Sequence, residues 1–358
     1  MSTLSPSFVA DDTIPVRADE IFDEDRLAGY LHGNLDDSEL SLTVRQFGGG
    51  AANLTYLLTF GGTQHYVLRR PPLGPVAKSA HDMGREFRVL SVLHQAYPFA
   101  PRAFLFCDDE AIIGAPFFVM ERRQGVVVRT HMPEQLSEMP DAPQKMGFAL
   151  IDALADFHAV DYDALGLAGL GKPEGFVERQ IEGWYKRWHA AKYEDSSEME
   201  ELYGWLRANK PETEAHTLVH NDFKLDNVML ATDDPAKLVA VFDWDMCTLG
   251  NPLNDLGALL CYWTELSDPE WMHGMTMMPV GVNFPTREEL VARYAERSGR
   301  DVASIRFYHV LGLFRLVGVI AQIYIRYVRG QTQDQRFAVF GERIPLIIRA
   351  AYELAFKA

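Results

Sequence analysis

The chain changes its hydrophobic pattern near Gly125, and this change constrains the fold more than any other feature. From Ser41 to about Glu121, short apolar runs alternate with glycines and polar residues, a pattern typical of strands. Between about His81 and Ala96, apolar residues recur at three- and four-residue steps, which predicts one helix. After Gly125 the pattern is mostly helical, with three short extended runs between residues 217 and 243. We therefore expect a small antiparallel sheet with one packed helix, followed by a larger helical part.

The length of 358 residues allows roughly two structural units. Acidic and apolar residues mix over 1–36, which we assign to an N-terminal extension carrying a surface helix. Residues 37–123 would form the sheet lobe, and residues 124–358 the helical lobe. The expected fold class is α+β, with a cleft between the two lobes.

Composition excludes several classes of protein. Lys and Arg number 34 against 50 Asp and Glu, and the resulting net charge of -16 argues against a nucleic-acid partner. Three cysteines without a CxxC pair fit a reducing cytosol. The N-terminus has no basic segment followed by an apolar run, and the apolar stretch 316–325 is too short to cross a bilayer. We expect a soluble cytoplasmic protein with no membrane partner. The sequence leaves open whether the protein forms a homodimer.

Polar residues gather at the ends of two short predicted strands, in VHNDFKLDNVML (219–230) and VAVFDWD (239–245). Asp222, Lys224 and Asn227 precede one strand and Asp243 ends the next, so their side chains would collect at one edge of a hairpin. Phosphoryl transfer needs an acceptor for the substrate hydroxyl proton, hard oxygen ligands for Mg²⁺ and a cation near the phosphate. We predict Asp222 and Lys224 as catalytic residues and Asn227 and Asp243 as magnesium ligands. A surface hairpin with polar turn residues is the alternative.

The pattern HxDxKxxN followed by an Asp on the next strand resembles the protein-kinase-like fold, and specifically the aminoglycoside phosphotransferase family. The downstream segment LGNPLNDLG is similar to the segment that follows the family's metal-binding Asp. The resemblance covers about residues 40–330. It implies ATP and Mg²⁺ as cofactors and a small-molecule hydroxyl acceptor as partner. It also implies that Asp255 braces the catalytic loop by hydrogen bonds and that His220 orients this loop without transferring a proton.

A glycine cluster in the N-terminal half suits a phosphate-binding turn. The run FGGGAANLTYLL places Gly48, Gly49 and Gly50 between two strand patterns and reads G-x-G-x-x-N, ending at Asn53. Glycines let backbone N–H groups approach phosphate oxygens closely. We predict these four residues as cofactor-binding; a glycine hairpin without a ligand is the alternative.

A kinase needs a cation on the strand after this turn and a carboxylate on the next helix. The strand HYVLRRPP has Arg69 and Arg70 where a kinase has its Lys. Because neighbouring strand residues point to opposite faces, Arg69 would face the phosphates and Arg70 the other side. Glu86 in GREFRVLSVL is the predicted partner of Arg69, although a solvated glutamate paired with a nearby arginine is the alternative.

The run PFFVMERR marks the last strand before the change of pattern. Backbone groups of Met120, Glu121 and Arg122 are predicted to bind adenine, and the sequence does not choose among them. VLRRPP, FFVMER and LADFHAVD are most similar to the phosphotransferase domains found beside or fused to acyl-CoA dehydrogenases. This similarity implies a hydroxylated acyl thioester as an acceptor.

Two other functions compete with an enzyme of this kind. A catalytically silent kinase-like module that binds nucleotide or a partner protein would explain Arg69 in place of Lys and the irregular glycine turn. A metallohydrolase using His220, Asp243 and Asp245 is disfavoured because no HExxH or paired HxH motif accompanies them. Arg315, Arg326 and Arg329, on an otherwise apolar helix, could meet a phosphate-bearing acceptor such as coenzyme A. Such arginines more often snorkel or pair with carboxylates, and we do not assign them to the site.

Overall fold

The computed structural model describes residues 13–36, 38–48, 53–72, 82–212, 215–273 and 275–357. The chain divides into two compact units. Unit 1 comprises Met1–Gln124 together with Phe242–Asp245, and unit 2 comprises Gly125–Val241 and Met246–Ala358. The short segment Phe242–Asp245 thus belongs with the N-terminal half although it lies late in the sequence.

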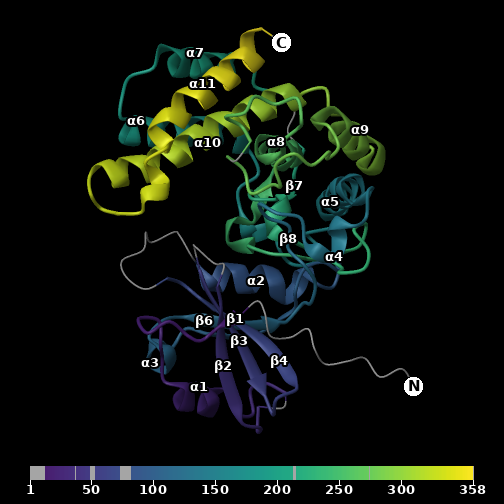
Figure 1. Cartoon of the computed structure of the whole chain (residues 1–358), viewed down its shortest axis with the longest axis vertical. Helices are drawn as coiled ribbons and strands as arrows, with labels where there is room; N and C mark the ends of the chain where they lie inside the picture. Colours follow the sequence, from purple (N-terminus) through teal and green to yellow (C-terminus); the bar gives the residue numbers. More distant parts are fainter. Residues whose placement is uncertain are drawn as a thin grey trace. The chain divides into compact units, whose positions relative to one another are not determined.

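Unit 1 is built on an antiparallel six-stranded sheet with the order β1-β2-β3-β4-β6-β5. Helix α2 (Met83–Leu93) packs against β5 and β6, as Figure 1 shows, and confirms the predicted helix. The side chain of Asp82 caps α2 by accepting a hydrogen bond from the Arg85 N–H. The strands are β1 (Thr13–Ile14), β2 (Leu42–Phe47), β3 (Leu54–Phe60), β4 (Gln64–Arg70), β5 (Ala103–Cys107) and β6 (Phe117–Glu121).

The segment before residue 37 is part of unit 1. Strand β1 pairs with β2, and helix α1 (Glu24–Leu31) buries Leu27 and Leu31 completely in the same core as Tyr56 and Phe117. Helix α3 (Glu110–Ile113) contacts α1. The apolar spacing in this segment therefore produces the predicted helix, which packs its apolar face on the sheet unit.

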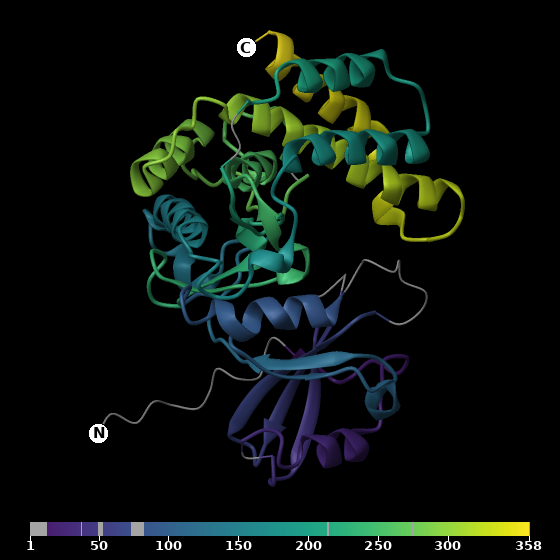
Figure 2. The same cartoon turned by 180° about the vertical axis from the view of Figure 1, so that it is seen from behind.

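Unit 2 is mainly helical, as the sequence predicts. Helices α6, α7, α10 and α11 pack against one another, which Figures 1 and 2 show from opposite sides. Two short antiparallel pairs, β7–β10 and β8–β9, lie among the helices. The strands are β7 (Thr217–Val219), β8 (Val228–Leu230), β9 (Leu238–Val241) and β10 (Thr248–Gly250). The helices are α4 (Glu134–Ser137), α5 (Ala142–His158), α6 (Phe176–Ala191), α7 (Ser197–Ala208), α8 (Pro252–Tyr262), α9 (Arg287–Ser298), α10 (Ile305–Val328) and α11 (Phe340–Phe356), with 3₁₀ turns at Ala168–Leu170, Leu225–Asn227 and Gln335–Phe337. A further 3₁₀ turn spans Trp244–Met246.

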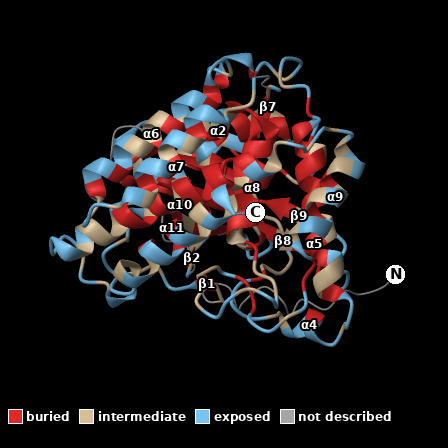
Figure 3. Cartoon of the chain, turned by 90° about the horizontal axis from the view of Figure 1, so that it is seen from above, coloured by how far each residue is buried: buried red, intermediate tan, exposed pale blue. Residues whose placement is uncertain are grey.

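Helix α8 forms the centre of unit 2. Every residue from Pro252 to Cys261 is buried, and Figure 3 shows α8 among the buried elements. Its closest neighbour is α10, which approaches at Gly257: a Cβ added there would lie 2.4 Å from the Tyr308 carbonyl carbon. Glycine at this position therefore allows the two helices to pack backbone to backbone.

Helix α10 extends beyond the apolar stretch 316–325 at both ends and has Arg315 near its middle. Its 24 residues are long and apolar enough to cross a membrane by length and composition. However, 56% of its most apolar window is buried inside the protein, where it packs against α6, α8 and α11, and a core helix passes the same test.

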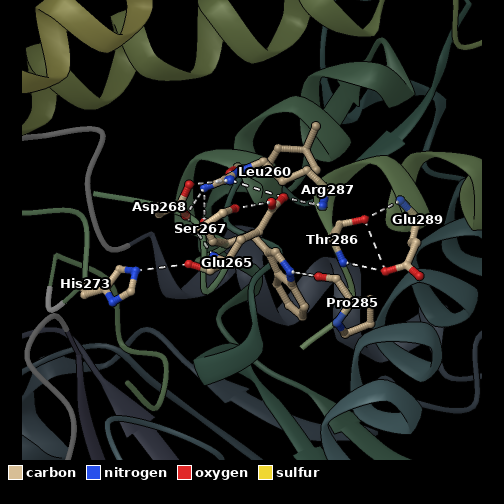
Figure 4. A network of polar contacts seen from close by, with 10 residues as sticks. Leu260, Glu265, Ser267, Asp268, His273, Pro285, Thr286, Arg287 and Glu289 are labelled. Atoms are coloured by element: carbon tan, nitrogen blue, oxygen red, sulfur yellow. Dashed lines mark hydrogen bonds and ion pairs between the residues drawn. The ribbon is translucent and has the colours of Figure 1, made fainter. Parts of the chain in front are cut away.

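The connection from α8 to α9 is held by Arg287. Its guanidinium donates to the Leu260 carbonyl at 3.1 Å and to the Asp268 carboxylate at 2.8 and 2.9 Å, and Figure 4 draws these contacts as dashed lines. A capping box begins α9, with reciprocal hydrogen bonds between Thr286 and Glu289. These contacts fix the segment that follows α8.

Candidate active site

The predicted catalytic residues of unit 2 lie on the loop between β7 and β8 and contact one another. The Asn227 amide nitrogen donates to the Asp222 carbonyl at 2.9 Å and to Asp222 Oδ2 at 2.8 Å. Lys224 Nζ lies 3.2 Å from the same Oδ2. The 3₁₀ turn Leu225–Asn227 brings Asn227 back toward Asp222. The structure thus brings together Asp222, Lys224 and Asn227, and the side chains of Asp222 and Lys224 keep about one fifth of their surface exposed.

Asp255 braces this loop, as the sequence analysis predicts. It lies in the first turn of α8 and accepts hydrogen bonds from the His220 and Asn221 backbone N–H groups at 2.6 and 2.7 Å. The ring of His158 lies 3.3 Å from Asp255 Oδ2. Burial raises the pKa of Asp255, but these hydrogen bonds and His158 outweigh it and hold the pKa below its usual range. A buried charged carboxylate with several donors therefore anchors the loop to α8.

His220 and Asn221 orient the loop through local contacts. His220 Nδ1 accepts from the Asp222 N–H at 3.2 Å, consistent with the orienting role implied by the resemblance. Asn221 has a φ of 67° and donates through its side chain to the Met246 carbonyl at 2.9 Å. Asparagine tolerates this left-handed backbone better than most residues. Asn221 was not predicted as a site residue, although its residue type and its position directly before Asp222 were the available signal.

Lys224 is surrounded by groups that keep it charged. Burial lowers its pKa, but Asp222 and Asp226 raise it more, and the net shift is upward. Its Nζ also lies 5.0 Å from the centre of the Tyr262 ring, a cation–π contact. Asp226, 3.8 Å from Lys224 Nζ, is a further acidic residue of the loop that the sequence analysis did not single out. Lys224 can therefore present a positive charge at any physiological pH.

Unit 1 carries a second charged cluster, around Arg69 on β4. Arg69 Nε lies 3.2 Å from Glu86 Oε2 on α2, so the predicted ion pair is present. Arg69 also contacts the Asp243 carboxylate, and the Glu86 carboxylate accepts from the Trp244 N–H at 3.4 Å. Asp243 itself has a φ of 67°, a strained conformation for a residue with a side chain. Arg69, Glu86 and Asp243, which lie far apart in the sequence, thus form one network.

Burial dominates the electrostatics of this network. The Glu86 side chain is 1% exposed, and burial raises its pKa to about 7, with Arg69 opposing the shift and Asp243 adding to it. Burial lowers the pKa of Arg69, but Glu86 and Asp243 raise it more. Arg69 therefore stays charged, and the negative charge of Glu86 depends on its presence.

Arg70 occupies the opposite face of β4, as strand alternation predicts. It is 1% exposed, and its guanidinium donates to the Tyr56 hydroxyl at 2.8 Å and to the carbonyls of Glu20 and Ile113 at 2.6 and 3.0 Å. It also lies over the Phe22 ring. These contacts assign Arg70 to the core of unit 1 and leave Arg69 as the phosphate-binding candidate.

The other predicted nucleotide-binding residues lie at strand ends of unit 1. Gly48 follows β2 and its carbonyl accepts from Arg17 at 3.2 Å, and Asn53 is buried directly before β3. Gly49 and Gly50 lie outside the described residues. Met120 and Glu121 end β6, and Arg122 follows them. The Glu121 N–H already donates to the Arg102 carbonyl at 2.8 Å, so a role for Glu121 in adenine binding would fall to its carbonyl.

Comparison with known proteins identifies the family. Residues 43–308 match the model of the phosphotransferase enzyme family, and the chain belongs to this family. Over 335 residues it is 33% identical to acyl-CoA dehydrogenase family member 11 of Rattus norvegicus, covering 91% of this chain and 42% of the relative. It is 30% identical over 331 residues to the probable acyl-CoA dehydrogenase IBR3 of Arabidopsis thaliana, covering 86% and 40%. The chain therefore spans less than half the length of these relatives. The predicted resemblance, including its link to acyl-CoA dehydrogenases, is confirmed.

Solved structures confirm the kinase-like fold. A Ralstonia eutropha protein assigned to the aminoglycoside phosphotransferases has a TM-score of 0.79 at 29% identity, covering 94% of this chain and 99% of that one. Choline kinase from Cryptosporidium parvum has a TM-score of 0.59 at 11% identity, covering 92% and 98%. An aminoglycoside phosphotransferase in ternary complex with ADP and hygromycin B has a TM-score of 0.57 at 17% identity, covering 92% and 98%. The predicted α+β, protein-kinase-like fold is thus correct, and the family supports small-molecule phosphotransferase activity.

Proposed function

We propose that the chain is an ATP- and magnesium-dependent phosphotransferase that moves the γ-phosphoryl group to a hydroxyl of a small molecule. One observation carries the proposal: Asp222, Lys224 and Asn227 contact one another on a loop that buried Asp255 anchors. Asp222 accepts the proton of the acceptor hydroxyl, held in place by the Asn227 amide. Lys224 offers its positive charge to the transferred phosphate.

In this proposal Asn227 and Asp243 would hold Mg²⁺, because both offer the hard oxygen atoms that it prefers. Asn227 directly precedes Val228 of β8 and Asp243 follows Val241 of β9, and these two valines are paired in the hairpin. The Asn227 nitrogen makes the two hydrogen bonds to Asp222, so its carbonyl oxygen is the atom suited to a cation. Mg²⁺ takes one or two protein oxygens and fills its other positions with phosphate and water. Bound there, it would neutralise charge that develops on the phosphoryl group.

Unit 1 would hold the nucleotide. Arg69 is fixed by Glu86 as the strand cation is in a kinase, and an arginine can bind phosphate oxygens bidentately. The ADP held by one of the structural neighbours supports a nucleotide as phosphate donor. We propose that the acceptor is an acyl compound with a free hydroxyl, because the sequence relatives are acyl-CoA dehydrogenase family members.

A silent nucleotide-binding module is the second candidate. The contact between Arg69 and Asp243 favours it, because Arg69 neutralises the carboxylate that would otherwise bind magnesium. In the silent module this ion pair persists when nucleotide is added. In the enzyme, Mg²⁺ and the phosphates compete with it.

The test combines binding with product detection. Calorimetric titration with ATP should show binding that requires Mg²⁺ and that Asp243→Ala abolishes. Incubation with Mg-ATP and a panel of hydroxy acids and their thioesters should yield a phosphorylated acceptor, identified by mass spectrometry. Nucleotide binding without product from any panel member would favour the silent module, and absence of nucleotide binding would contradict the proposal.

A further inference from the structure

Arg315, at the middle of α10, has an unusual environment for a charged residue. Its guanidinium carbon lies 5.5 Å from the centre of the Trp184 ring, and its Nη2 lies 3.9 Å from the Met246 sulfur. Across the described part of the chain, no carboxylate lies within ion-pair distance of Arg315. This is notable in a chain with 50 acidic and 34 basic residues, where a partner would be easy to supply. Among the described residues, the Arg315 guanidinium is therefore held by a ring and a sulfur and not by a carboxylate.

Neighbouring contacts fix the Arg315 side chain in place. Trp184 on α6 is 8% exposed, and its indole N–H donates to Gln180 at 3.1 Å. The approach of α6 to α10 requires glycine at position 318, since an added Cβ would lie 2.9 Å from the Trp184 ring. The indole thus forms a rigid surface for the guanidinium, and a fixed arginine loses less entropy when it binds a ligand.

The same contacts connect Arg315 to the catalytic loop. The Met246 residue that touches Arg315 also accepts, through its carbonyl, the hydrogen bond from Asn221, which directly precedes Asp222. Tyr262 supplies a second connection, because Lys224 Nζ lies over its ring. The pKa of Tyr262 is raised by burial and by Asp222 and is lowered by Lys224 and Arg315, which agrees with all three charges lying near this ring.

We propose that Arg315 binds an anionic group of the phosphoryl acceptor and thereby selects acidic acceptors over uncharged and cationic ones. The inference rests on the proposed function, because it concerns the acceptor of that reaction. The anion is a carboxylate or a phosphate, either of which the guanidinium can bind through two hydrogen bonds. Aminoglycosides and choline, the compounds named for the structural neighbours, are cations that Arg315 would repel.

The experiment compares each anionic ligand with an uncharged counterpart. Hydroxy acids of four to ten carbons are titrated by calorimetry beside their methyl esters, and hydroxyacyl-CoA beside the hydroxyacyl-pantetheine that lacks the nucleotide phosphates. The variants are Arg315→Gln, Arg315→Lys and the control Arg329→Gln, which removes the same charge from an exposed position at the end of α10. The same ligands are then assayed for phosphorylated product.

We expect wild type to bind the anionic member of at least one pair ten-fold or more tightly. Arg315→Gln should remove this preference, Arg315→Lys should keep most of it, and Arg329→Gln should match wild type. In turnover, Arg315→Gln should raise KM ten-fold or more and change kcat little, as expected for a binding contact. A preference for acid over ester would assign the anion as a carboxylate, and a preference for CoA over pantetheine as a phosphate.

Two results would overturn the inference. The first is that wild type binds charged and uncharged ligands equally well, or binds neither. The second is that Arg315→Gln keeps the full preference for the anionic ligand. The proposed function fails separately. Anion-dependent binding that needs Arg315 but yields no phosphorylated product would refute the enzyme, and would leave Arg315 as an anion-binding residue of a module that transfers no phosphate. If Arg315→Gln forms product as well as wild type does, the enzyme is supported and the inference about Arg315 is refuted.

Discussion

Adjacent residues of β4 show how the same side chain takes two roles in this protein. Arg69 contacts Glu86 and Asp243, whereas Arg70 binds Tyr56 and two backbone carbonyls in the core. Strand alternation predicts that they point to opposite faces, and the predicted Arg69–Glu86 pair is present. The contact with Asp243 was not predicted, because 174 residues separate the two and no local pattern links them.

Asp255 and Asn221, which hold the catalytic loop, likewise differ in how far the sequence predicts their roles. The bracing role of Asp255 followed from a motif. The residue type of Asn221 is compatible with a left-handed turn, but its hydrogen bond to the Met246 carbonyl joins positions 25 residues apart that no local pattern links.

Removing the charge of Arg69 should destabilise unit 1. Arg69→Met leaves Glu86 buried without its cation, which costs about 3–5 kcal/mol in the free energy of unfolding. The double variant Arg69→Met with Glu86→Leu should recover more than half of this loss, since an apolar pair needs no compensating charge. Urea unfolding monitored by fluorescence measures both. A loss below 1 kcal/mol in the single variant would show that Glu86 is protonated and indifferent to Arg69.

At the scale of elements, α8 positions the catalytic loop, and its packing against α10 holds α8 in place. Asp255 lies in the first turn of α8, and Gly257 lies two residues further on, against the Tyr308 backbone of α10. The helical pattern predicts both helices. It does not predict their close approach, which depends on where glycines of two separate segments meet.

Gly257→Ala should be destabilising by about 1–3 kcal/mol, because its Cβ would overlap the Tyr308 backbone. Gly204→Ala is the matched control: Gly204 is an exposed position in α7 with no atom within 4 Å of an added Cβ. Alanine there should stabilise by about 0.5–1 kcal/mol, since it is the better helix former. Thermal unfolding of the two variants checks the opposite signs. A neutral Gly257→Ala would mean that α8 and α10 can separate at little cost.

His309 on α10 should make stability depend on pH. Burial, with Arg287, lowers its pKa to about 3, below the value of about 6.5 expected in the unfolded chain. The unfolded chain therefore takes up the proton first, so the contribution of His309 is complete above pH 6.5 and declines as the pH falls toward 3. Between pH 6.5 and 5 the loss should be about 1–2 kcal/mol, allowing for partial solvent exposure. Urea titrations at these two pH values measure the free energy of unfolding, and its loss between them should be smaller in His309→Gln than in wild type. An equal loss in both proteins would show that His309 is exposed to solvent.

At the scale of the whole molecule, the fold was predictable because its pattern and its motifs agree. The strand-to-helix change near residue 125, the predicted helix at α2 and the HxDxKxxN loop all specify a kinase-like phosphotransferase, and the family and structural comparisons confirm it. The acceptor could not be predicted in the same way. In our proposal Arg315 recognises the acceptor. Its surroundings come from helices of distant segments, so its role could not be predicted from the local sequence.

The chain also spans only about two fifths of the length of its acyl-CoA dehydrogenase relatives. The phosphotransferase fold is nevertheless matched over nearly the full length of solved structures.

The rate of phosphoryl transfer by an Asp222→Asn variant decides whether Asp222 acts in catalysis. The rate of phosphorylated acceptor formation from Mg-ATP would be compared with wild type and with Asp233→Asn, an exposed hairpin position that undergoes the same chemical change. We predict a rate lowered by about 10²–10⁴ in Asp222→Asn, with the affinity for Mg-ATP unchanged within two-fold, and a wild-type rate in Asp233→Asn. Full turnover by Asp222→Asn would contradict the account.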